Sequence, residues 1–188
     1  MNATAITSTM TTEELFALPD DGIERDIIRG ELREYPVTKR SRRHSKVMVA
    51  VGHILLSWVI DKKVGGEVAA GEAGVRLRRN PETSVGIDVA YFSMKSLSEM
   101  PVDQPWYDGP PELAVEILSP SDTHENLVEK INLYLECGVP VVWILDPDFQ
   151  TVTVYRSSTA PSMLRVHETL DGHPELPGFS APVRDFFR

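Results

Sequence analysis

Only one cysteine, Cys137, occurs among the 188 residues, which excludes an internal disulfide and a cysteine-rich zinc site. Long apolar runs are also missing: the longest, over residues 47–60, is interrupted by Gly52 and His53 and is too short to span a bilayer. Residues 1–10 lack the apolar segment of a signal peptide, and we expect them to form a flexible leader. These absences lead us to expect a cytoplasmic protein with no membrane partner.

Positive charge is scarce as well. Lysine and arginine number 19 against 28 aspartates and glutamates, so the net charge is −9 at pH 7. That balance argues against a protein that coats nucleic acid non-specifically, because such binding depends on neutralising phosphates. With 41% hydrophobic and 25% charged residues the composition is that of a globular protein, and the length suits one domain, which we place at residues 11–188.

The charge is uneven, however, because no acid occurs between Glu34 and Asp61. Basic side chains are concentrated in this gap. They are Lys39, Arg40, Arg42, Arg43, His44 and Lys46. A local basic patch on an acidic protein is able to bind a polyanion such as nucleic acid. The alternative is that these side chains only solubilise a turn and the first turn of a helix.

Helices are predicted where capping residues precede apolar residues at helical spacing. Their ranges are 11–18, 41–62 and 122–137, the last capped by Asp122 with Glu125. Strands are predicted where short apolar or alternating runs lie between turn residues. They are a hairpin over 25–35, strands over 67–70, 75–78, 85–92, 111–120, 139–146 and 151–156, and one strand after 163. Residues 93–110 are predicted to be a loop. The order of elements predicts one α/β domain with a mixed sheet.

Two of these strands each carry one acid among apolar residues. Glu116 lies in the run bounded by prolines, and Asp88 lies in 85–92. An ionised carboxylate in a buried strand is costly unless a cation or hydrogen bonds compensate. Small residues on the same strand face, such as Gly86 and Ala114, leave room for an ion. If the strands are neighbours, both acids are able to bind one cation; otherwise each acid caps a strand end or pairs with an arginine.

Lys130 lies in the helix that follows the Glu116 strand. At about 100° per residue its side chain falls in the apolar half of the helix, beside Cys137. A lysine in that position either extends its amine outward along the apolar stem or reaches buried carboxylates. Tyr134 lies on the same face, one turn further on.

A family resemblance rests on these residues together. Asp88, Glu116 in Glu-Ile-Leu-Ser-Pro-Ser, Lys130 in Lys-Ile-Asn-Leu-Tyr, and the segment 138–147 resemble, in order and spacing, the Uma-two family of restriction endonucleases. That family belongs to the PD-(D/E)XK nuclease superfamily, and the resemblance covers about residues 11–188. It implies a restriction-endonuclease-like core of helix, three strands, helix and strand (α-β-β-β-α-β), with a mixed central sheet and extra N- and C-terminal strands.

The resemblance also implies metal-dependent hydrolysis of nucleic-acid phosphodiester bonds, foremost in DNA, with Mg²⁺ or Mn²⁺. By position, Asp88 corresponds to the first metal ligand and Glu116 to the second. The superfamily pattern expects a lysine two residues after that glutamate, where this chain has Leu118. Lys130 is then the expected replacement, as a third catalytic residue.

Further roles follow from the resemblance. Tyr134 is expected to orient Lys130 or to contact the nucleic-acid backbone, and Glu31 is a candidate third carboxylate. His44 is a candidate auxiliary residue near the start of its helix, although the sequence favours a structural, hydrogen-bonded histidine over that role. The basic residues of 39–46 would contact phosphates.

A second class of function stays open. Leu118 at the lysine position and the acidic net charge favour a nuclease-like fold that has lost catalysis and serves as a binding or assembly module. A homodimer is compatible with either function. The aromatic pairs Trp106–Tyr107 and Phe186–Phe187 are candidate contact surfaces for it.

Overall fold

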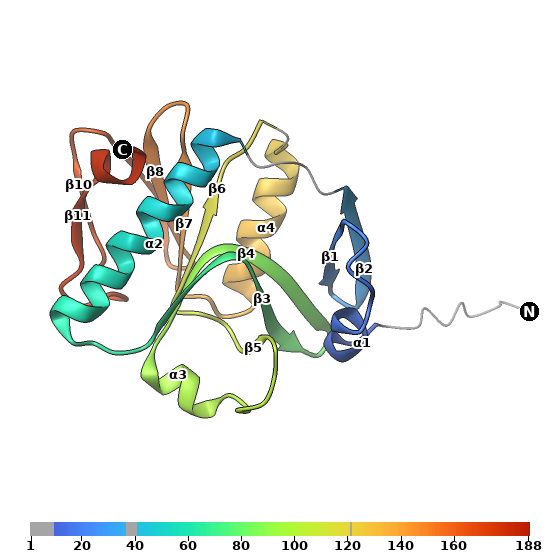
Figure 1. The fold of residues 1–188 in the computed structure, drawn as a ribbon. Helices are drawn as coiled ribbons and strands as arrows, with labels where there is room; N and C mark the ends of the chain where they lie inside the picture. The colour runs from blue at the N-terminus through green and yellow to red at the C-terminus, as the bar shows by residue number, and fades with distance from the viewer. Residues whose placement is uncertain (1–9, 37–40, 121) are drawn as a thin grey trace, which may run out of the picture.

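The computed structural model describes residues 10–36, 41–120 and 122–188, which form a large mixed sheet with helices on both faces and a small second sheet (Figure 1). The helical segments are α1 (Thr12–Phe16), α2 (Arg42–Lys62), α3 (Met94–Glu99), α4 (His124–Glu136) and the 3-10 helix η1 (Val183–Phe187). The strands are β1 (Ile23–Ile28), β2 (Glu31–Pro36), β3 (Glu67–Arg79), β4 (Glu82–Phe92), β5 (Tyr107–Asp108), β6 (Leu113–Ile117), β7 (Val141–Asp146), β8 (Thr151–Arg156), β9 (Thr159–Arg165), β10 (Thr169–Asp171) and β11 (Ser180–Pro182).

The large sheet is ordered β2-β1-β4-β6-β7-β8-β9, with β3 paired to β4 and β5 paired to β3. Most neighbouring strands are antiparallel. The parallel pairs are β3 with β5 and β6 with β7, and α4 connects β6 to β7. The predicted fold class, an α/β restriction-endonuclease-like core with a mixed sheet and extra strands at both ends, is therefore confirmed. The buried strands β6 and β7 read as nearly continuous apolar runs because both of their faces are covered.

One edge of β4 is shared by two strands. β3 occupies nearly the whole of one edge of β4. β1 and β6 also pair with β4, so both of them must lie along its second edge. β1 meets β4 at Ser84, and β6 meets it at Val89. Between these two points the edge of β4 lacks a paired strand among the described residues, and the site described below opens at this gap.

The long helix α2 covers one face of the sheet. The Ser41 side chain accepts from the His44 N–H and caps the helix, which ends at Lys63 in a left-handed conformation. Its buried residues Val47 and Leu55 lie on the helix face that points away from solvent. They pack in a core layer with residues of the small sheet and of η1.

Helix α4 covers the opposite face. Its buried residues Ile131, Leu133 and Tyr134 pack with side chains of β3, β4 and β7 in a second core layer. The Thr123 side chain caps the helix by accepting from the Asn126 N–H. The two core layers thus place the N-terminus of α2 and the first half of α4 at the same open part of the β4 edge.

Several local predictions are corrected. The two strands predicted over 67–70 and 75–78 are one strand, β3, because the glycine-rich segment between them forms a β-bulge at Gly71 and Glu72 rather than a turn. The cap of α4 is Thr123, since Asp122 instead accepts from the Ser119 N–H. The predicted loop 93–110 contains α3 and β5, and the region after 163 holds more than one strand.

The two aromatic pairs that the sequence offers as contact surfaces also make contacts within the chain, and only Phe186 is buried enough to be removed from that prediction. Phe186 is fully buried against Trp143, and Tyr107 stacks on Phe92. Trp106 packs against Phe16. Among the described residues, no helix is long and apolar enough to cross a membrane.

Candidate active site

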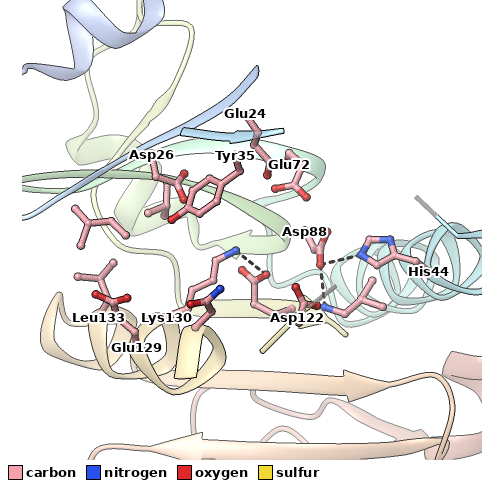
Figure 2. Close-up of a pocket in the computed structure, with 15 residues that line it drawn as sticks. Glu24, Asp26, Tyr35, His44, Glu72, Asp88, Asp122, Glu129, Lys130 and Leu133 are labelled. Carbon is pink, nitrogen blue, oxygen red and sulfur yellow. Dashed lines mark hydrogen bonds and ion pairs between the residues drawn. The ribbon is translucent and has the colours of Figure 1, made fainter. Parts of the chain in front are cut away.

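A cavity of about 320 Å³ opens between the hairpin β1–β2, strands β4 and β6, and helix α4 (Figure 2). Most of its charged lining side chains are acidic. The acids are Glu24, Asp26, Glu72, Asp88, Glu116, Asp122 and Glu129. The basic groups in the lining are Lys130 and His44. A recess with this excess of carboxylates has a negative potential that attracts cations.

Asp88 lies where β6 separates from β4. The register pairs Val89 with Val115, so one step further Asp88 faces Glu116. Asp88 Oδ2 accepts from the Ile117 backbone N–H at 2.8 Å and lies 3.2 Å from His44 Nε2. Burial opposes the charge of Asp88, but the hydrogen bond and charge of His44, with the Ile117 N–H, lower the pKa of Asp88 below its ordinary value.

Glu116 is held by two side chains of α4, one helical turn apart. Lys130 Nζ donates to Glu116 Oε2 at 2.8 Å, and the Tyr134 hydroxyl donates to Oε1 at 2.5 Å. The spacing of four residues puts both donors on the same helix face, as the sequence predicted. Lys130 therefore does not simply extend into solvent, and neither acid is paired with an arginine in the described residues.

Burial governs the ionisation of this group. It raises the pKa of Glu116 to about 7, helped by the charge of Asp88 and opposed by Lys130. Burial alone would lower the pKa of Lys130, but the charges of Glu116 and its neighbours raise that pKa well above the ordinary value, so Lys130 is cationic. The pKa of Tyr134 is also raised, by burial and by Glu116, so its hydroxyl stays a donor.

The residues present fit a divalent cation. Asp88 is only 3% exposed, and its Oδ1 has no hydrogen-bond partner in the described chain, which is costly for a buried carboxylate oxygen. Glu116 keeps lone pairs on both oxygens beyond those that Lys130 and Tyr134 use. No group of three or more His, Cys, Asp or Glu within the described residues is arranged to hold a metal. The donor set is thus two carboxylates, which suits Mg²⁺ completed by water and phosphate.

Other residues singled out in the sequence are distributed differently. His44 is 1% exposed and contacts Asp88, with its Nδ1 lacking a partner in the described chain. Glu31 is exposed at the start of β2 and does not line the cavity. The exposed basic residues Arg42, Arg43 and Lys46 lie on the first two turns of α2. Lys39 and Arg40 lie outside the described residues.

Sequence reasoning did not find the acids on the opposite wall of the cavity. Asp26 of β1 accepts from the Gly86 N–H at 3.1 Å, and burial raises the pKa of Asp26. Glu72 reaches over Gly86, where an added Cβ would lie 2.8 Å from Glu72 Oε2. The sequence holds a signal for each acid. Asp26 directly precedes two isoleucines in β1. Glu72 follows a glycine within a strand, which is typical of a bulge that turns a side chain in a new direction.

Comparison with known proteins bears on this arrangement. Residues 12–184 match the model of the Uma2 family, described as "Putative restriction endonuclease". The chain belongs to the Uma2 family. This confirms the resemblance that rested on Asp88, Glu116, Lys130 and the segment 138–147. The comparison with curated proteins gives no match.

A solved structure shows the same fold. It is described as the crystal structure of a putative nuclease belonging to DUF820, from Anabaena variabilis, and it is 20% identical in sequence. The similarity covers 95% of this chain and 97% of that chain, with a TM-score of 0.76. At this identity the likeness establishes the fold alone. The description of the Uma2 family, and not this structure, places the chain among nuclease-type proteins.

Proposed function

We propose that this protein is a metal-dependent endonuclease that hydrolyses phosphodiester bonds of DNA, with Mg²⁺ or Mn²⁺ bound by Asp88 and Glu116. The observation that carries the proposal is the meeting of three groups in one cavity: the partnerless Oδ1 of Asp88, the carboxylate of Glu116, and the amine of Lys130. Membership of a family described as restriction endonucleases supports DNA as the substrate.

The cation, when bound, would polarise the phosphodiester and make water a better nucleophile near neutral pH. The protein side chains supply the rest. His44 and the Ile117 N–H hold Oδ2 of Asp88, which would leave Oδ1 to bind the cation. Tyr134 fixes the other carboxylate by its bond to Oε1 of Glu116. In the proposed step the oxygen of water forms a bond to phosphorus and its proton is lost to solvent. The bond from phosphorus to the leaving oxygen breaks, and that oxygen takes up a proton from solvent, so the products are a phosphate end and a hydroxyl end.

Lys130 takes the place of the lysine that the superfamily pattern expects at Leu118. Its amine is a cation beside Glu116, where it would orient the attacking water or stabilise the charge that develops on the phosphate. In this chain the amine comes from helix α4, whereas the superfamily pattern places it on the strand that corresponds to β6. In both cases the amine lies beside the same carboxylate, here Glu116. This supports an active enzyme over a fold that has lost catalysis.

Nucleic acid would approach along the start of α2. Arg42, Arg43 and Lys46 are exposed there, and His44 on the same turns lines the cavity. Cationic side chains beside an acidic recess would hold the phosphate backbone while a cation enters the recess. Lys39 and Arg40 of the same basic stretch lie outside the described residues. A homodimer stays a prediction that light scattering would check.

Two measurements on the purified protein test the proposal. The first is nicking of supercoiled plasmid with Mn²⁺ or Mg²⁺, which is expected for the wild type and lost in Asp88→Asn and Glu116→Gln. The second is the melting temperature with and without the cation. A ligand at 100 times its Kd stabilises the folded state by about 2.7 kcal/mol, so the melting temperature must rise in the wild type.

Asp103→Asn is the matched control, because Asp103 is an exposed acid outside the cavity. It should nick plasmid and respond to the cation like the wild type. If neither cation raises the melting temperature and DNA and RNA both stay intact, the binding or assembly module becomes the better interpretation. Circular dichroism of each variant checks that the substitutions at buried positions leave the fold intact.

A further inference from the structure

A groove of about 710 Å³ lies next to the acidic cavity. Its walls are the first turns of α2, the chain that leaves β6, and the turn between β7 and β8. Neighbouring residues face the two spaces: Ile117 lines the cavity and Leu118 the groove, while His44 lines the cavity and Arg43 the groove. The groove therefore adjoins the candidate active site at the end of β6. Figure 1 shows the N-terminal end of α2 beside the carboxyl end of β6.

Two acids, Asp146 and Asp148, line the groove, and both bond to other groups of the protein. Asp146 Oδ1 accepts from the backbone N–H of Asp148 at 2.8 Å and of Phe149 at 3.0 Å, which fixes the β7–β8 turn. Asp148 forms an ion pair with Arg43 and so ties this turn to the start of α2. Both acids thus serve to hold the groove together.

The remaining charges of the groove are positive. Arg42 and Lys46 are exposed, line the groove and have no ion-pair partner within the described residues. Two cations presented on successive turns of one helix match the phosphates of a nucleic-acid strand. Their interaction with phosphate does not depend on sequence.

Phe149 lines the same groove and is 81% exposed. A large ring at the tip of a fixed turn, beside free cations, offers a flat face on which a base stacks. Stacking on a ring requires the base to be unpaired.

We infer that the groove binds an unpaired nucleic-acid strand, with Arg42 and Lys46 on its phosphates and Phe149 stacked on a base, next to the phosphate that enters the cavity. This rests on the proposed function, and it specifies the substrate as single-stranded, flapped or locally melted nucleic acid. The nuclease is therefore expected to cut where the strands are unpaired, which in a supercoiled plasmid means locally melted segments, and to leave a short relaxed duplex uncut.

Fluorescence anisotropy of labelled oligonucleotides tests this inference with the wild-type protein in EDTA, where cleavage is prevented. The probes are a thymidine 20-mer, a uridine 20-mer and a blunt duplex of the same length. We expect tighter binding of a single strand than of the duplex. The first two probes distinguish DNA from RNA as the source of the strand.

Phe149→Ala should weaken single-strand binding about tenfold, which corresponds to about 1.4 kcal/mol of lost stacking. Phe149→Trp should restore it, and Val102→Ala, at a 95% exposed residue outside the groove, should bind like the wild type. Lys46→Met should lower the slope of log affinity against log salt by about 0.7, the value for one phosphate contact on a single strand.

Equal binding by Phe149→Ala and wild type, or tighter binding of the duplex, would overturn the inference. The outcome is separable from that of the proposed function. If cleavage depends on the cation but Phe149→Ala binds a single strand like the wild type, the proposed nuclease function is supported and the role of the groove is rejected. If strand binding depends on Phe149 but no cation gives cleavage, the role of the groove is supported and the proposed nuclease function is rejected.

Discussion

Lys130 Nζ lies 2.8 Å from Glu116 Oε2, so an amine carried by helix α4 meets a carboxylate carried by strand β6. The superfamily pattern places both groups on one strand, where this chain has Leu118. The protein instead brings them together by packing α4 on the face of the sheet that bears Glu116. The amine therefore depends on tertiary packing for its position.

Replacing Lys130 by methionine keeps the length of the side chain and removes the charge. If Lys130 acts on water or phosphate, Lys130→Met should lower the rate of plasmid nicking by about 100-fold or more, the usual cost of one lost electrostatic stabiliser. The rise in melting temperature with Mn²⁺ should persist, because Asp88 and Glu116 remain. Rates measured at saturating Mn²⁺ check the first part, and thermal melts check the second.

The control for this change is Lys95→Met, at an exposed lysine of α3 far from the cavity lining. It should leave both the rate and the cation response unchanged. A Lys130→Met protein that nicks at the wild-type rate would remove Lys130 from the catalytic group.

The hydroxyl of Tyr134 is expected to stabilise the fold through Glu116. Tyr134 is fully buried, and its bond to Oε1 compensates a buried carboxylate. Tyr134→Phe should lower the free energy of unfolding by about 1.5–3 kcal/mol, the range for a hydrogen bond to a charged group. Urea denaturation measures the change. Tyr155→Phe is the comparison, since no hydrogen bond of its hydroxyl occurs in the described chain; an equal loss in both variants would contradict the prediction.

How far the sequence predicts this site depends on which residues are considered. Asp88 and Glu116 were found because an acid within an apolar strand is rare, and Lys130 because helical spacing directs it inward. Their meeting also required β4 and β6 to be neighbours in a given register, which no local pattern reveals. The family resemblance supplied that step.

The opposite wall of the cavity has weaker sequence signals, which do not by themselves place Asp26 and Glu72 at the site. Asp26 faces the cavity because β1 pairs only with the first part of β4 and leaves Gly86 to bond a side chain. Glu72 enters through a bulge whose residues Gly71 and Glu72 both have positive φ. Such a bulge reads in the sequence as a turn between two strands, which is why one strand was predicted as two.

The hairpin β1–β2 is tied to α4 by an ion pair at the rim of the cavity. Arg33 Nη1 and Nη2 lie 2.7 and 2.9 Å from the two carboxylate oxygens of Glu129, and each side chain is about one-third exposed. Partly exposed pairs of this kind are coupled by about 0.2–1 kcal/mol. Arg33→Glu should destabilise the protein, and adding Glu129→Arg should recover the coupling energy.

A double-mutant cycle from urea denaturation measures that energy, and it should shrink in 1 M salt because exposed charges are screened. A coupling that is unchanged by salt would mean that packing of the two long side chains, not their charge, holds the hairpin. The pair of Arg188, which is exposed, with the partly buried Asp185 offers a comparison within the same chain, where no coupling above about 1 kcal/mol is expected.

The interior ion pair of Arg76 should matter far more. Arg76 is 2% exposed, and its guanidinium donates to both oxygens of Asp108, at 2.9 and 2.6 Å, and to Glu13 at 2.6 Å. Arg76→Met leaves Asp108 buried without its main partner, which should cost about 3–5 kcal/mol. Arg79→Met is the matched control, because Arg79 pairs with the same acid from an exposed position and should cost less than about 1 kcal/mol.

The pH dependence of that loss gives a second readout. The hydrogen bond from Arg76 lowers the pKa of Asp108 below its ordinary value of 3.8. A carboxyl group whose pKa is lowered by folding stabilises the protein above its unfolded pKa, and this contribution disappears as the pH falls through the folded-state pKa. The difference in unfolding free energy between wild type and Arg76→Met should therefore be constant near neutral pH and shrink from about pH 5 downward. Urea denaturation across that pH range measures it, and a difference that grows on acidification would show that Asp108 is not the group stabilised by Arg76.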